Sequence, residues 1–322
     1  MTPDPSLAAL SNQLFSVSVA LYSVAVVAFC AQLAFGRRPV RTPELVAAGG
    51  GAAPTAPTAA DVLSEPARSR RWGAIAVAVT ALGALTHLGV MVTRGLAAGR
   101  LPWGNMYEFG TAVTLVGVVA FLVFAVRVPA VRHLGLFVMA PVVLAMVGIG
   151  LFLYAEAGPL VAALRSSWLA VHVTSAILGF GIFFLSGIVS AMYLARSRYD
   201  AKLAEGQAQP DGVLSRLPSA ATLDRVAHRT AVFGFPIWTF AVIAGAIWAE
   251  SAWGRFWGWD PKETWAFIAW VVYAAYLHAR TTAGWRGRAA AWVNVTGLVV
   301  MVFNLLYVNM VSTGLHSYAG LK

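Results

Sequence analysis

The sequence contains very little cysteine and very little charge. Cys30 is the only cysteine among 322 residues, and it lies inside a hydrophobic run. Because a dithiol relay needs two neighbouring thiols, the chain does not pass disulfide electrons through cysteines of its own. Charged residues make up only 11% of the chain and hydrophobic residues 59%, which excludes an ordinary soluble domain.

What the chain has instead is long apolar runs. A helix that spans a bilayer needs about 20 mostly apolar residues. Stretches of that kind are 14–35, 72–93, 107–126, 133–154, 171–195, 231–248, 264–278 and 291–311. The seventh is short, but it lengthens if its helix begins at Asp260. The sequence therefore predicts an all-α polytopic membrane protein with about eight transmembrane helices surrounded by lipid.

The basic residues predict the orientation of these helices. Lysine and arginine concentrate in cytoplasmic loops. If the N-terminus lies outside, the inner segments hold every basic residue except Arg94, Arg100, Arg165, Arg255, Lys262 and Lys322. Both termini are therefore expected to be extracytoplasmic. This bias accounts for the net charge of +10 without a nucleic acid partner, and the scarcity of charge inside the spans argues against an ion-coupled transporter.

The chain divides into two predicted parts. Residues 1–71 are expected to form an N-terminal transmembrane helix and a flexible cytoplasmic linker, because 49–60 is a tract of Gly, Ala, Pro and Thr. The first apolar run has no basic residues before it and no clear cleavage site, so it is expected to be retained. Residues 72–322 are expected to form the main transmembrane domain.

Aromatic residues are densest at 253–265, a stretch named here the tryptophan loop. It contains Trp253, Trp257, Trp259 and Trp265, with Arg255 and Lys262 beside them. Tryptophan also gathers at membrane interfaces, so these rings can be simple anchors. The alternative is an apolar surface for a broad planar ligand whose carboxylates are held by the two cations. Haem is such a ligand, because it combines a macrocycle, propionates and an iron that needs axial ligands.

The same loop carries a helix start signal. Asp260 fits an N-cap, Pro261 the first helical position and Glu263 the capping-box partner. These residues can therefore be scaffold whatever the tryptophans do.

Three histidines are candidates for iron ligands. His172 and His316 border spans on the predicted outer side. They can be the two axial ligands of one haem, or they can simply face water. His278 lies about five helical turns, or ~27 Å, beyond Asp260 and so near the inner face. It is either a functional residue inside a span or a histidine that extends its side chain to the inner interface.

Other polar residues are weaker candidates. Glu108 opens the third span from outside, where it can be a site carboxylate or an acid that complements the helix dipole. His87 lies in the outer half of the second span. His133 and His228 border inner loops and are expected to be interfacial.

Taken together, these motifs resemble the CcsA/ResC cytochrome c biogenesis proteins of the haem-handling WWD superfamily. The resemblance rests on Trp253-Gly254-x-x-Trp257-x-Trp259-Asp260-Pro261-Lys262-Glu263-Thr264-Trp265, Tyr276-Leu277-His278-x-Arg280, Gly314-Leu315-His316-Ser317-Tyr318, Asn105-x-x-Glu108 and His172 after a tryptophan. It covers the chain from about Trp72 onward, and residues 1–71 match less well. Ala319 stands where the family pattern leads us to expect glycine.

The resemblance implies a function in the bacterial plasma membrane. Haem b would be received from the inner side at His278, opposite a ligand from a CcsB/ResB-type partner, and would then be held outside by His172 and His316. An apocytochrome c, kept reduced by extracytoplasmic thiol reductant proteins, would present its Cys-x-x-Cys-His segment for thioether attachment. The chain would then be part of a cytochrome c haem lyase. The alternative is a haem exporter or chaperone without ligase activity of its own.

Overall fold

A computed structural model describes residues 3–36, 66–127, 132, 134–158, 166–208, 213–282 and 285–316. Three features that were predicted from the sequence lie outside these residues. They are the linker tract 49–60, His133, and Ser317 and Tyr318 of the last motif.

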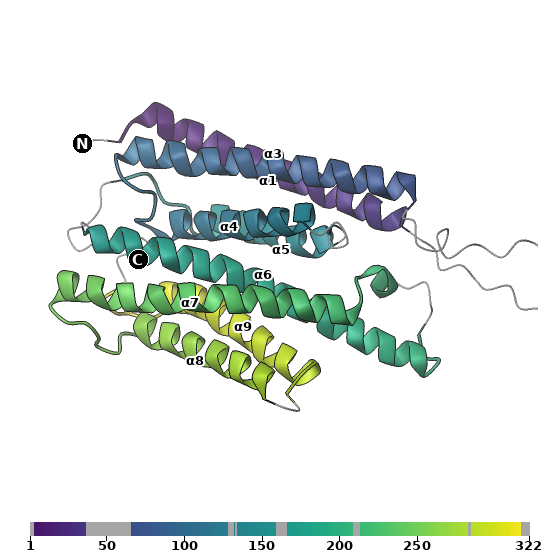
Figure 1. The fold of residues 1–322 in the computed structure, drawn as a ribbon. Helices are drawn as coiled ribbons and strands as arrows, with labels where there is room; N and C mark the ends of the chain where they lie inside the picture. Colours follow the sequence, from purple (N-terminus) through teal and green to yellow (C-terminus); the bar gives the residue numbers. More distant parts are fainter. Residues whose placement is uncertain are drawn as a thin grey trace, which may run out of the picture.

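Within the described residues the fold is built from eight long α-helices and one short 3₁₀ helix, η3 (Val213–Arg216) (Figure 1). The α-helices are α1 (Pro5–Ala34), α3 (Ala67–Ala98), α4 (Met106–Arg127), α5 (Gly135–Phe152), α6 (Ser167–Ala204), α7 (Ala220–Trp253), α8 (Pro261–Thr281) and α9 (Arg288–Met310). The all-helical prediction is confirmed.

Seven of these helices are long and apolar enough to cross a membrane, and α8 is the exception. The sequence predicted α8 as a short eighth span. It has 21 residues, with Lys262 and Glu263 in its first turn and His278 and Arg280 in its last. These polar ends leave only a short apolar centre, although the helix runs alongside α9 like the other members of the bundle (Figure 1).

Several helices are longer than the apolar runs predicted. Hydropathy detects only the apolar part of a helix, whereas the helix continues until a residue leaves the helical backbone conformation. In α3 that residue is Gly99, which adopts a left-handed conformation with φ of 60°. The start of α7 is set by Ser219, whose side chain accepts a hydrogen bond from the Thr222 backbone N–H.

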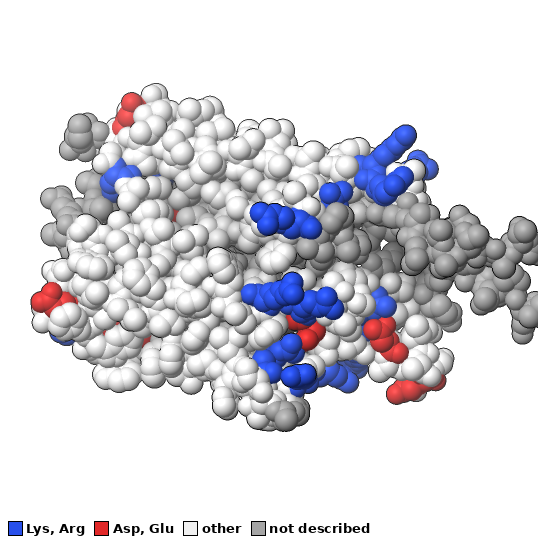
Figure 2. Space-filling view, viewed as in Figure 1, with Lys and Arg blue, Asp and Glu red and all other residues white. Residues whose placement is uncertain are grey.

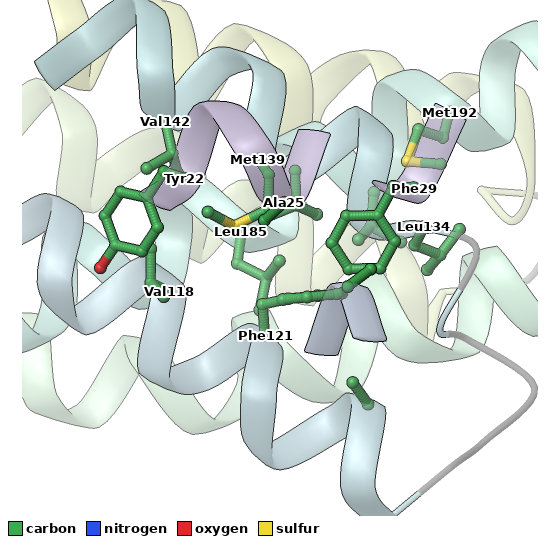
Figure 3. Close-up of a cluster of buried hydrophobic side chains, with 14 of the residues drawn as sticks. Tyr22, Ala25, Phe29, Val118, Phe121, Leu134, Met139, Val142, Leu185 and Met192 are labelled. Atoms are coloured by element: carbon green, nitrogen blue, oxygen red, sulfur yellow. The ribbon is translucent and has the colours of Figure 1, made fainter. Parts of the chain in front are cut away.

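Helix α6 lies at the centre and joins two hydrophobic cores. One core packs the C-terminal half of α6 against α1, α3, α4 and α5; within it the rings of Phe29 and Phe121 meet edge-on, and Tyr22 lies beside Val118 and Val142 (Figure 3). The second packs the N-terminal half of α6 against α7, α8 and α9. Small residues allow this close approach: a Cβ at Gly187 would lie 2.6 Å from a Leu298 side-chain atom.

The bundle has two chemically different ends. One, named here the histidine end, holds the starts of α1, α4, α6 and α8 and the ends of α3, α5, α7 and α9 (Figure 1). Lysine and arginine side chains gather toward the opposite, basic end (Figure 2). This distribution matches the predicted grouping of the loops. That the basic end faces the cytoplasm, with both termini outside, stays a prediction.

Candidate functional site

The tryptophan loop contains the C-cap of helix α7 and the N-cap of helix α8. Helix α7 ends at Gly254, whose left-handed backbone (φ 71°) donates to the Glu250 carbonyl. Helix α8 begins after Asp260, whose carboxylate accepts from the Lys262 N–H at 3.0 Å. Glu263 completes the capping box by accepting from the Asp260 N–H at 3.1 Å. The sequence therefore identified the local role of Asp260 correctly as an N-cap.

Asp260 also holds the segment that follows α9. Its Oδ2 accepts from the Leu315 N–H at 2.7 Å, and its Oδ1 lies 2.8 Å from Nδ1 of His316. A Cβ at Gly314 would lie 2.4 Å from Asp260 Oδ2, so this approach requires glycine. Burial raises the pKa of the Asp260 carboxyl, but the hydrogen bonds from His316 and the two backbone N–H groups outweigh it, and the pKa falls below its usual value.

His172 reaches the same place from α6. Its Nδ1 lies 2.9 Å from the carbonyl oxygen of Ala241 in α7. Its ring packs over Gly245, where an added Cβ would lie 2.7 Å from the imidazole. Both contacts hold the imidazole against α7, near the end of the bundle at which His316 also lies.

Two tryptophans of α7 join the histidines. The Trp248 ring is stacked on His172 at 5.9 Å between centroids, and it meets His316 edge-on at 5.7 Å. Trp253 lies 4.9 Å from His316. Trp248 was not among the site residues predicted from the sequence, although its position five residues before the tryptophan loop was a usable signal.

His172, His316 and Trp248 line a mostly apolar cavity of about 140 Å³. Its polar lining comes from His172, His316 and Lys262, together with asparagines at 105, 304 and 309. Among the described residues, no side-chain hydrogen bond or ion pair involves Lys262; burial lowers the pKa of its amine to about 7, and the Asp260 carboxylate nearby partly offsets this shift. An apolar cavity of about 150 Å³ accommodates a benzene-sized molecule, so a macrocycle can enter only if the walls separate.

The remaining residues of the tryptophan loop differ in their distance from the cavity histidines. Trp257 and Trp253 line a smaller adjoining cavity of about 60 Å³ that also touches both histidines. Trp259 is 65% exposed with a positive φ of 57°, and Arg255 lies 3.7 Å from the Glu263 carboxylate. Trp265 turns away and packs on Phe303 of α9.

Glu108 lies outside the cavity, in a buried ion-pair cluster. Its carboxylate accepts from Arg94 Nε at 3.1 Å, from Arg100 Nη1 at 2.8 Å and from the Gly104 N–H at 2.7 Å. This cluster fixes the loop between α3 and α4, which carries Trp103 and Asn105 into the cavity wall.

His278 lies far from the cavity histidines. It is exposed near the C-terminal end of α8, at the basic end of the bundle (Figure 1). Val271 and Phe267 are exposed about two and three turns before it on the same helix. His87, by contrast, is fully buried and bonded to the Tyr22 hydroxyl at 3.1 Å.

The bundle and the paired histidines define a multi-pass membrane protein with an apolar, histidine-lined cavity at one end. A family model described as "Cytochrome C assembly protein" matches residues 103–316, and the chain belongs to this family. The matched segment begins at Trp103 and ends at His316, so it includes both cavity histidines and the tryptophan loop.

Similar proteins carry the name "Cytochrome c biogenesis protein CcsA". The one from Guillardia theta is 34% identical over 262 residues, which cover 76% of this chain and 85% of that protein. The one from Synechococcus elongatus is also 34% identical, over 285 residues that cover 76% and 87%. For Synechococcus sp. (strain RCC307) the identity is 42%, but the 179 aligned residues span only 58% of that relative's length.

Proposed function

We propose that this chain binds haem and positions it for attachment to apocytochrome c during cytochrome c biogenesis. The observation that carries the proposal is the pairing of His172 and His316 at one apolar cavity, each with its Nδ1 held by an oxygen of the chain. An iron already held by a macrocycle needs only two axial ligands. A bare metal ion is less suited, because the described residues contain no group of three or more potential metal ligands.

The other cavity residues have complementary roles in this proposal. Trp248 and Trp253 supply flat apolar surfaces beside the histidines. Lys262 supplies a cation for a propionate of the haem. Trp257 lines the smaller cavity and contacts the exposed Trp259, and this part of the loop is where the chain can move outward to admit the macrocycle.

A second station involves His278. About 27 Å separates it from Asp260 along α8, so one haem cannot reach both His278 and the cavity. Because His278 lies on an exposed face with Phe267 and Val271, an opposite iron ligand has to come from another molecule. A CcsB/ResB-type membrane protein is the proposed source, and haem arriving from the cytoplasm is bound here first.

Attachment is the addition of two thiols to two vinyl groups. Each cysteine S–H of the Cys-x-x-Cys-His segment adds across a vinyl C=C, so an S–C bond forms and the proton goes to the second carbon. The addition consumes no oxidant, provided that thiol reductant proteins keep the cysteines reduced. The chain contributes position and iron ligation.

The test begins with the absorption spectrum of the purified chain, co-expressed with its partner. We expect a bis-histidine haem spectrum. His172→Ala and His316→Ala should each reduce haem at the cavity and cytochrome c assembly, and added imidazole should restore part of both. His228→Ala, a histidine of the basic end with no proposed role, is the control. Normal haem content and assembly in both cavity variants would refute the ligand assignment.

A haem exporter or chaperone is the second candidate. It predicts the same spectrum, so only a reaction can separate the two. Purified haem-loaded complex is mixed with a reduced apocytochrome, and the pyridine haemochrome spectrum is recorded for thioether bonds. Covalent product supports the lyase, whereas transfer of unattached haem supports the exporter.

A further inference from the structure

Asp260 accepts more hydrogen bonds than a helix cap requires. Its side chain is only 4% exposed and accepts three hydrogen bonds. One, from the Lys262 N–H, is the cap. The other two, from Leu315 and His316, come from 55 and 56 residues further along the chain. Capping alone does not explain these two.

The carboxylate fixes the tautomer of His316. An ionised carboxylate can only accept hydrogen bonds, so Nδ1 of His316 has to carry a hydrogen. Any iron bond made by neutral His316 would therefore use Nε2. In His172, Nδ1 faces the Ala241 carbonyl, which is also an acceptor only. Both imidazoles are thus held in the same tautomer, but by different acceptors.

The two acceptors differ in charge. Asp260 carries a full negative charge and the Ala241 carbonyl only a partial one. A carboxylate behind a ligating imidazole fixes the ring and raises its basicity as a metal ligand, and its loss typically costs 10- to 100-fold in metal affinity. On this basis His316 is the stronger donor and His172 the weaker one.

We propose that Asp260 is a positioning residue that acts through His316, so that His316 retains the haem iron while His172 is the ligand exchanged for the histidine of the apocytochrome. The inference rests on the proposed function. In the exchange, the bond between iron and His172 Nε2 breaks and a bond to the incoming imidazole forms, with no change in the number of electrons.

The first experiment measures the midpoint potential of the cavity haem in the purified complex. Asp260→Asn and Asp260→Ser both preserve an N-cap, but neither keeps the charge behind His316. We expect the preference for ferric over ferrous iron to fall about tenfold in both, which raises the potential by about 59 mV for one electron. Glu250→Gln removes an exposed carboxylate of α7 at the same end of the bundle and keeps the Asp260–His316 contact, so it should leave the potential unchanged.

A double-variant cycle separates action through His316 from general damage. In His316→Ala supplied with 1-methylimidazole, the added ligand has no N–H to donate to Asp260, so adding Asp260→Asn should change the potential no further. An additional shift equal to that in the single variant would show that Asp260 does not act through His316, and would overturn the inference.

A second experiment changes nothing at Asp260. Haem loss to an apomyoglobin trap is timed in His172→Ala and in His316→Ala. The inference predicts loss about tenfold faster from His316→Ala, because that variant lacks the stronger ligand. Faster loss from His172→Ala, or a wild-type potential in Asp260→Asn, would refute it while leaving the proposed function intact. Absence of haem from the wild-type cavity would refute both.

Discussion

Replacing Glu108 by glutamine tests whether this carboxylate serves the haem site directly or holds the wall beside it. The Glu108 side chain is 0% exposed, and it faces Arg94, which is 1% exposed, and Arg100, which is 12% exposed. Two cations thus share one buried carboxylate. Glutamine keeps the shape and one acceptor oxygen but leaves both guanidinium groups without their counter-charge.

The expected loss of stability in Glu108→Gln follows from the burial of these charges. Removing one partner of a buried ion pair costs about 3–5 kcal/mol, because the remaining charge stays desolvated. At about 2–4 °C per kcal/mol for a chain of this size class, we expect Tm to fall by about 10 °C. The Tm of Glu108→Ala should fall further, since this change also removes the acceptor for the Gly104 N–H.

Tm is measured by tryptophan fluorescence in detergent, on the complex and in parallel with haem content. Glu156→Gln is the matched control, because Glu156 is exposed and forms no hydrogen bond or ion pair within the described part of the chain. We expect its Tm to equal that of the wild type. A Glu108→Gln protein with unchanged Tm but an empty cavity would refute the structural role and favour a direct contact between Glu108 and haem.

Three further predictions concern the loop, the stations and the topology. Gly314→Ala should empty the cavity of haem in absorption spectra, because its Cβ would collide with Asp260, whereas Gly148→Ala meets nothing within 4 Å and should bind normally; equal haem content would contradict the tight approach. His278→Ala should empty both stations when haem is counted per protein, while removal of both cavity histidines should trap haem at the basic end; a filled cavity in His278→Ala would mean another entry route. Reporters active only outside the cytoplasm should work when fused near Ser251 and fail near Gly206, and the reverse pattern would invert the predicted orientation.

The local pattern of the sequence determined the membrane class and the helix starts. Runs of about 20 apolar residues mark spans because a helix satisfies its own backbone in lipid. The cap at Asp260 was predictable because capping involves only the next few residues. The shared end of His172 and His316 followed from counting spans between them. The lengths of α3, α6 and α7 were underestimated, since hydropathy does not detect the more polar ends of a helix.

Contacts between distant segments were decided by the tertiary structure alone. The same Asp260 that caps α8 also binds His316, which depends on α9 returning to the start of α8 and on the close approach at Gly314. The sequence left two roles possible for Glu108, a carboxylate of the site or an acid that complements the helix dipole. Packing instead places Arg94 of α3 against its carboxylate. The contacts of Trp248 with His172 and His316 likewise depend on how α6, α7 and the segment after α9 pack together. Sequence periodicity describes which residues share a helix face, but which faces meet is set by how all the helices pack together.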